Sequence, residues 1–145
     1  MSAAILWPTF AMVALIFTVV MSMAARRFAY IRSHKPRRED FANTAAQKAY
    51  FAPIDSAANN LANLFEMPVL FFALVPLLLL FRHADHVQTA LAWGFVMLRA
   101  LHSYIHITAK PALWRFRAYL GSCIVLSVMW IGFAIDMAMA AATGG

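Results

Sequence analysis

Residues 59–81, NNLANLFEMPVLFFALVPLLLLF, decide the fold class of this protein. From residue 67 onward the stretch has no charged or hydrogen-bonding side chain, and its whole length is enough for the ~20 residues that a helix needs to cross a bilayer. Its beginning, in contrast, contains three asparagines and a glutamate. The stretch therefore predicts a membrane-spanning helix that carries polar groups at one end.

The whole chain has the composition of an integral membrane protein. It has 145 residues, of which 63% are hydrophobic, and its mean hydropathy of +0.71 is well above that of soluble domains. Four apolar runs predict helices at about 5–25, 57–81, 87–108 and 117–140. Because short turns make neighbouring helices antiparallel, we expect an all-α integral membrane fold. It would be an up-down bundle of four transmembrane helices in a single domain, residues 1–145.

The distribution of positive charge predicts how the chain is oriented. The formal net charge is +6, and most lysines and arginines lie in the connections at about 26–56 and 109–117, whereas the second connection has only Arg82. Cytoplasmic loops typically carry such an excess of lysine and arginine. We therefore expect a multi-pass protein with both termini outside and its basic loops in the cytoplasm. Membrane lipid headgroups, and not nucleic acid, are the expected partners of these cations.

A polar stripe runs along the start of the second predicted helix. Asn59, Asn63 and Glu66 are spaced i, i+4 and i+7, which places them on one helical face. An acidic residue at the centre of a bilayer costs about 2.5–3.5 kcal/mol on insertion scales. We therefore expect this face to contact protein, and Glu66 to have a partner.

The third predicted helix offers such a partner. Arg99, His102 and His106 are spaced i, i+3 and i+7, and this helix runs in the opposite direction. Each polar stripe covers about 10.5 Å along its axis. We therefore predict an ion pair between Glu66 and Arg99, within a chain or between subunits. Such a stripe either holds the bundle together or binds a polar ligand near the cytoplasmic surface, and both interpretations stay open at this point.

Three motifs in these regions resemble those of a known family. They are NLFEMP at 63–68, RALHSYIH at 99–106 and PALWRFRAY at 111–119. Together they are similar to the MAPEG family, the membrane-associated proteins in eicosanoid and glutathione metabolism. The resemblance covers all four helices, and it implies a homotrimer with glutathione bound between subunits near the cytoplasmic side.

The resemblance also implies roles for individual residues. Arg115 corresponds to the arginine that stabilises the glutathione thiolate. Two positions depart from the family pattern, because Asn59 stands where an arginine is usual and His106 stands where a tyrosine is common. These departures predict a divergent member, for which we expect a bacterial inner membrane. The implied glutathione-binding residues are Asn59, Asn63, Glu66, Arg99, His102 and His106.

The function implied by the resemblance is that of a membrane-bound glutathione transferase or peroxidase acting on lipophilic electrophiles. A nearby cation favours the thiolate, which is the nucleophile. One alternative is a non-catalytic trimeric membrane protein that binds a lipid or a partner, an interpretation that Asn59 favours. Another is a small proton-coupled transporter that uses Glu66, although a cation close to Glu66 would hold its carboxylate ionised.

The two histidines of the third helix raise the question of a metal. His102 and His106 are one turn apart and could both reach an ion. Their segment, HSYIH, has no cysteine beside it and no acid nearby on the same helix. We therefore predict no metal or haem site.

Overall fold

The structure, a computed structural model, describes residues 3–108 and 111–142, and every regular element within them is helical. The long helices are α1 (Leu6–Ser33), α4 (Met67–Leu80), α5 (His86–Ile107) and α6 (Ala112–Ala142). The shorter elements are η1 (Ala3–Ile5), η2 (Arg38–Phe41), α2 (Thr44–Phe51), η3 (Ala52–Ile54) and α3 (Ser56–Leu64).

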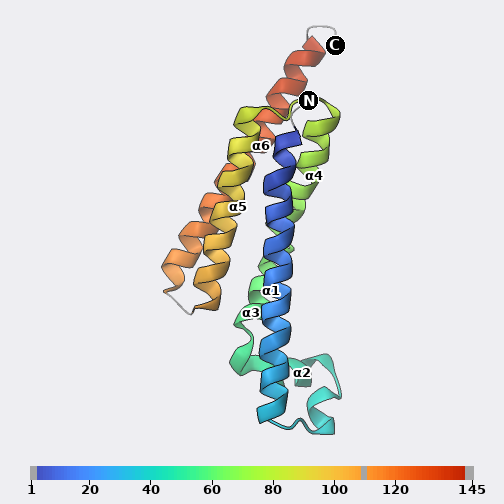
Figure 1. Ribbon diagram of the computed structural model, residues 1–145, viewed down its shortest axis with the longest axis vertical. Helices are drawn as coiled ribbons and strands as arrows, with labels where there is room; N and C mark the ends of the chain where they lie inside the picture. The colour runs from blue at the N-terminus through green and yellow to red at the C-terminus, as the bar shows by residue number, and fades with distance from the viewer. Residues whose placement is uncertain (1–2, 109–110, 143–145) are drawn as a thin grey trace.

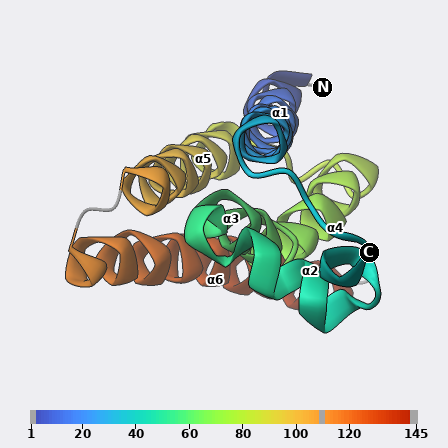
Figure 2. The ribbon, with the colours of Figure 1, turned by 90° about the horizontal axis from the view of Figure 1, so that it is seen from below.

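The helices form an elongated bundle (Figure 1). α1 lies alongside α3 and α4, which follow one another, and α5 and α6 form an antiparallel hairpin at their side. The start of α1 and the end of α6 lie at one end, and α2 lies at the other. Figure 2 shows the bundle end-on, with α3 close to both α1 and α5.

Three helical segments are long and apolar enough to cross a membrane, namely Ala3–Ser33, Ser56–Leu80 and Ala112–Ala142. Large apolar side chains are exposed along them instead of being packed inside. On α6 they recur every three or four residues and so form one continuous stripe. The stripe consists of Leu113, Phe116, Leu120, Ile124, Val128, Ile131, Ile135 and Met139. Such exposure is stable only against an apolar medium, so the chain is an integral membrane protein.

The helix predicted at 57–81 is two helices in the structure. α3 ends at Leu64 and α4 begins at Met67, and Glu66 between them has non-helical angles, φ −89° and ψ −89°. Pro68 has no N–H to donate to the carbonyl of Leu64, and proline is well placed in the first turn of a new helix. The interruption separates the polar start of this segment from its apolar remainder.

Two further differences concern the ends of the helices. α1 continues to Ser33, beyond residue 25, because the charged residues that follow the apolar run are also good helix formers. α6 begins at Ala112, earlier than residue 117, and ends at Ala142. The connection after α1 contains α2, which the hydrophobic pattern did not predict. Arg27 ties this connection to α1, since it lies 3.6 Å from a carboxylate oxygen of Asp55.

A core of apolar side chains joins α1, α4, α5 and α6. Phe71 of α4 and Phe95 of α5 stack with their ring centres 4.9 Å apart, and neither is exposed. Around them lie Ile5, Met12, Val19, Leu64, Leu74, Val75, Leu78, Ala92, Val96, Leu126, Met129 and Phe133. The core therefore lies toward the end of the bundle where α1 begins, and the buried residues in the other half of α5 are mostly polar, namely Arg99, His102 and Ser103 beside Ile105.

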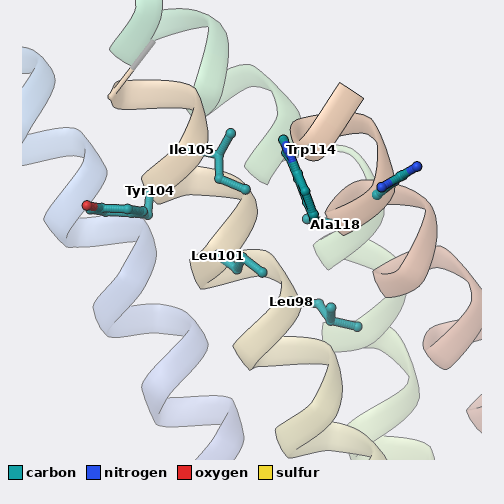
Figure 3. Close-up of a pocket in the computed structure, with 7 residues that line it drawn as sticks. Leu98, Leu101, Tyr104, Ile105, Trp114 and Ala118 are labelled. Carbon is teal, nitrogen blue, oxygen red and sulfur yellow. The ribbon is translucent and has the colours of Figure 1, made fainter. Parts of the chain in front are cut away.

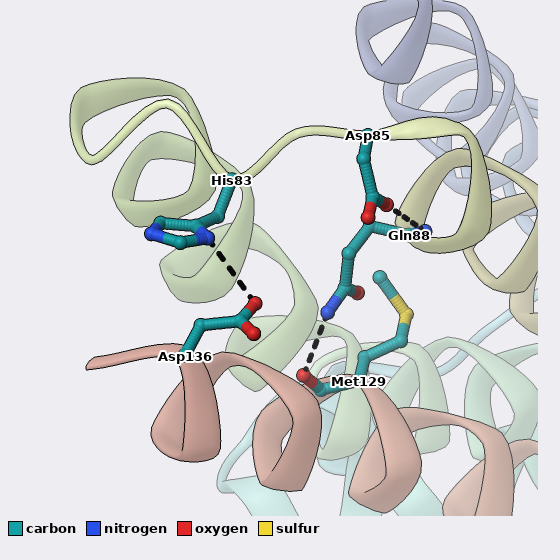
Figure 4. A network of polar contacts seen from close by, with 5 residues as sticks. All are labelled: His83, Asp85, Gln88, Met129 and Asp136. Atoms are coloured by element: carbon teal, nitrogen blue, oxygen red, sulfur yellow. Dashed lines mark hydrogen bonds and ion pairs between the residues drawn. The ribbon is translucent and has the colours of Figure 1, made fainter. Parts of the chain in front are cut away.

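The connection between α4 and α5 is tied down by polar contacts (Figure 4). Arg82 has a φ of 62°, in the left-handed region that favours glycine. This conformation lets the N–H groups of Arg82 and His83 donate to the last free carbonyls of α4, those of Leu79 (3.3 Å) and Leu78 (2.8 Å). Nδ1 of His83 then lies 3.2 Å from Oδ2 of Asp136, which joins the connection to α6.

The first turn of α5 is fixed in the same way. Oδ1 of Asp85 accepts a hydrogen bond from the backbone N–H of Gln88 at 2.7 Å, as an N-cap residue does. The side chain of Gln88 donates to the carbonyl of Met129 on α6 at 3.1 Å. Gly132 leaves room for this contact, because a Cβ there would lie 3.3 Å from Nε2 of Gln88. α5 and α6 are thus held at a definite register.

Candidate functional site

A polar cavity of about 360 Å³ lies between α3, α5 and α6, near the connection between α5 and α6. Its lining residues are Asn63, His102, His106, Ala112, Arg115, Phe116 and Tyr119. The cavity therefore joins residues of all three segments that the sequence singled out, 63–68, 99–106 and 111–119.

Helical periodicity explains why two residues of α5 and two of α6 form one cluster. His102 and His106 are one turn apart, as are Arg115 and Tyr119. Nδ1 of His102 lies 3.1 Å from the carbonyl oxygen of Arg115. Because a carbonyl oxygen only accepts, Nδ1 of His102 carries a proton and donates it. The centre of the His102 ring is 5.8 Å from those of both His106 and Tyr119.

Arg99 lies next to the cavity and has no exposed surface. Its Nη2 donates to the carbonyl oxygen of Asn63, and its guanidinium carbon is 5.7 Å from the centre of the Tyr119 ring. The Asn63 carbonyl is available because α3 ends at Leu64 and leaves the carbonyls of its last turn without helical partners. Nε and Nη1 of Arg99 have no partner within the described part of the chain. Unpaired donors on a buried cation favour an anionic ligand.

The predicted ion pair between Glu66 and Arg99 is not formed within the chain. Glu66 is exposed, and no cation in residues 3–108 or 111–142 lies within ion-pair distance of it. The prediction assumed one continuous helix, in which Glu66 would share the face of Asn63. The interruption before Pro68 takes Glu66 off that face. A pair between Glu66 of one subunit and Arg99 of another stays a prediction.

The asparagines of α3 also differ from expectation. Asn59 is exposed and does not line the cavity, whereas Asn60 is fully buried. Both side-chain amide atoms of Asn60 lack a partner among the residues described. Sequence reasoning followed the i, i+4 spacing from Asn59 to Asn63 and missed Asn60, although i, i+3 defines a helical face equally well. It also missed Tyr119, for which the four-residue spacing from Arg115 was the available signal.

A comparison with family models identifies the family. The model of the MAPEG family matches residues 5–135. This chain belongs to the MAPEG family. The match includes α3, α5 and the turns of α6 that line the cavity. No curated protein and no solved structure matches the chain significantly.

The cavity of this MAPEG protein is cationic. Arg115 lines it, Arg99 lies beside it, and none of the described lining residues is acidic. Nε2 of His102 and Nδ1 of His106 have no partner in the described chain, like the two nitrogens of Arg99. No three His, Cys, Asp or Glu side chains within the described ranges are grouped so that they could hold a metal ion. The arrangement can bind a polar ligand that carries negative groups.

Proposed function

We propose that this MAPEG protein is a membrane-bound glutathione transferase or peroxidase that acts on lipophilic electrophiles. The observation that carries the proposal is the cationic cavity in which Arg115, His102 and Asn63 meet beside the buried Arg99. Glutathione has carboxylates, amides and a thiol, and the cavity offers unpaired donors for such groups. Membership of the family supports glutathione as the ligand.

In this proposal each polar group of the cavity either binds glutathione or positions a residue that does. Arg99 binds a glutathione carboxylate through Nε and Nη1, and its hydrogen bond to the Asn63 carbonyl holds the guanidinium in place. The Asn63 side chain and His106 line the same space and hydrogen-bond the peptide groups of the ligand. His102 positions Arg115, because it is bonded to the Arg115 carbonyl.

Arg115 stabilises the glutathione thiolate. A free thiol of this kind has a pKa of about 8.5, and a neighbouring cation lowers it toward neutral pH. The thiolate attacks an electrophilic carbon of a substrate dissolved in the bilayer, so that a C–S bond forms and the leaving group takes its bonding electron pair. With a hydroperoxide, sulfur instead takes the terminal oxygen and releases an alcohol. A second glutathione then reduces the sulfenic acid, which yields the disulfide and water.

Asn59 and Glu66 become part of the proposed site when subunits associate. Both residues are exposed in the single chain, and both lie within Ser56–Leu80, a segment apolar enough to cross a membrane. An acid that faced lipid would cost up to about 3 kcal/mol. An adjacent subunit that covers this surface removes the penalty. This supports a homotrimer in which glutathione binds between subunits and contacts Asn59 and Glu66 at the interface.

We also propose the topology that the charge pattern predicts, with α5 as a fourth span in a single domain of residues 1–145. α5 has 22 residues, about 33 Å at helical rise, and its one charged side chain, Arg99, is buried against protein. The basic connection that holds α2 lies at the end of the bundle opposite the start of α1 and the end of α6 (Figure 1). Both termini would be outside, and the basic loops would face the cytoplasm of a bacterial inner membrane.

The ultraviolet absorbance of the thiolate tests this function. Glutathione is titrated into detergent-purified protein at neutral pH, and a thiolate signal should grow to saturation. The Arg115→Gln variant should bind glutathione without the signal, whereas Lys48→Gln, which removes an exposed cation of α2, should behave like the parent protein. No signal in the parent protein, or an undiminished one in Arg115→Gln, rejects the proposal.

A non-catalytic role is the second candidate, and Asn59 in the place of the usual family arginine favours it. In that case a trimer that binds a lipid or a partner protein would form without a thiolate signal. A proton-coupled transporter would use Glu66, which forms no ion pair within the described chain. Proton-driven efflux that is lost in Glu66→Gln would support the transporter over both other functions.

A further inference from the structure

The α5–α6 hairpin has a second hollow, which shares no lining residue with the polar cavity. It is a groove of about 480 Å³ between the two helices, shown in Figure 3. Leu98, Leu101 and Ile105 line it from α5, and Trp114 and Ala118 line it from α6. The walls are thus almost wholly apolar.

The groove follows α5 for about two helical turns. Leu98 and Ile105 are seven positions apart on α5, about 10.5 Å along the helix axis. Ala118 is buried between the helices. Beyond it the helices approach closely, since a Cβ added to Gly121 would lie 3.4 Å from Cδ1 of Leu98. Ala118 and Gly121 therefore mark the side on which α6 comes close to α5, and the apolar lining residues follow α5 over a length suited to part of an acyl chain.

One end of the groove carries a positive charge. Arg117 lines it and lies with its guanidinium carbon 5.2 Å from the centre of the Trp114 ring. Arg117 is exposed, and no acidic side chain within residues 3–108 and 111–142 lies within ion-pair distance of it. A tryptophan and an arginine at the beginning of an apolar helix are typical of the membrane interface, where the headgroups lie.

We propose that this groove binds an anionic phospholipid, with its phosphate on Arg117 and an acyl chain along Leu98, Leu101 and Ile105. The bilayer that surrounds an integral membrane protein supplies this molecule at high concentration. A cation at the rim of an apolar groove, with no acidic partner among the described residues, is complementary to an acidic headgroup. The phosphate of the headgroup also gives the Arg117 guanidinium a negatively charged partner that no acidic side chain of the described chain supplies. The assignment is independent of glutathione, because it uses neither the residues nor the charge of the polar cavity.

Native mass spectrometry of the detergent-purified protein tests the proposal with two added lipids of identical acyl chains, phosphatidylglycerol and phosphatidylcholine. We expect the parent protein to prefer phosphatidylglycerol by about fivefold, the effect of one cation near an anionic headgroup. Arg117→Gln should abolish the preference while binding of phosphatidylcholine persists. Leu101→Trp should weaken binding of both lipids, because Leu101 is half exposed and a larger side chain there fills the groove.

Two matched controls locate the effect. Leu120→Trp adds the same ring to α6 at an exposed position that does not line the groove, and Lys48→Gln removes an exposed cation elsewhere. Both should bind the two lipids as the parent protein does. Equal binding of the two lipids by the parent, or an unchanged preference in Arg117→Gln, overturns the proposal. The proposal is also overturned if Leu120→Trp loses as much lipid binding as Leu101→Trp. A third contradicting result is that the protein binds added oleate but no phosphatidylglycerol.

Discussion

The two halves of α5 differ in how many of their buried polar side-chain atoms have a hydrogen-bond partner in the described chain. In the first half, Gln88 donates to the Met129 carbonyl and Asp85 caps the helix, and Oε1 of Gln88 is the one buried side-chain atom there without a partner among the described residues. In the second half, buried polar atoms without a partner recur along two turns. They belong to Arg99, His102, Ser103 and His106.

This difference indicates which polar residues serve the fold and which serve a ligand. Buried polar groups in folded proteins nearly always have partners, because leaving them unpaired costs free energy. The first half of α5 follows that rule and holds α5 against α6. The second half departs from it at the place where the polar cavity lies. Departures of this kind concentrate at functional sites, and a ligand or water supplies the missing partners.

Arg115→Gln should have the largest effect on function. If Arg115 stabilises the thiolate, turnover of glutathione with 1-chloro-2,4-dinitrobenzene should fall about 100- to 1,000-fold, the loss typical of one electrostatic contact to a developing charge. Lys48→Gln is the control and should keep parent activity. Turnover within about threefold of the parent in Arg115→Gln would remove this residue from the proposed chemistry.

Arg99→Met should separate binding from stability. The buried guanidinium has no acidic partner in the described chain, so an apolar side chain of similar length should leave the free energy of unfolding equal or raise it by about 1–3 kcal/mol. Glutathione should no longer stabilise the variant. Unfolding in sodium dodecyl sulfate, followed by circular dichroism with and without glutathione, measures both effects. A variant that is clearly less stable without ligand would show that Arg99 serves the fold.

Gln88→Leu should show the opposite behaviour. It removes the hydrogen bond from α5 to the Met129 carbonyl and should lower the free energy of unfolding by about 1–2 kcal/mol. Its affinity for glutathione should be unchanged, since Gln88 lies in the other half of α5. The same unfolding experiment with a glutathione titration tests both statements, and a joint loss of stability and affinity would contradict the division of α5 into two halves.

Arg82→Gly should have the smallest effect, and it should be stabilising. Arg82 adopts a φ of 62°, which glycine adopts without the steric penalty of about 1 kcal/mol that a side chain incurs. The higher flexibility of glycine in the unfolded chain offsets part of the gain. We expect the free energy of unfolding to rise by about 0.5 kcal/mol, and a decrease would show that the Arg82 side chain itself contributes to this turn.

The sequence predicted the helical membrane fold and the segments that form the cavity. Hydrophobic runs are visible in composition alone, and the spacing of His102 and His106 on one helix follows from periodicity. A kink at Pro68 follows from the sequence, because proline cannot donate to the carbonyl of Leu64, but the full interruption at residues 65–66 does not, since tertiary packing selects between a kink and a new helix. For the same reason the position of Glu66 was predicted wrongly within the chain.

Other features depend on contacts between helices that a linear pattern does not contain. Asn60 is buried because its face of α3 is covered by neighbouring helices, α1 and α5 being those in contact with α3, and the sequence does not distinguish this face from that of Asn59. Tyr119 lines the cavity because the first turns of α6 lie beside His102, whose ring centre is 5.8 Å from that of Tyr119. The groove that Arg117 lines likewise depends on the register of α5 and α6.

Calorimetric titration of glutathione into the detergent-purified protein, together with its oligomeric mass, tests the central claim most directly. The account predicts saturable binding by a trimer, lost in Arg99→Met and retained in Gln88→Leu. No binding by the parent protein, or equal binding by the parent and Arg99→Met, would contradict it.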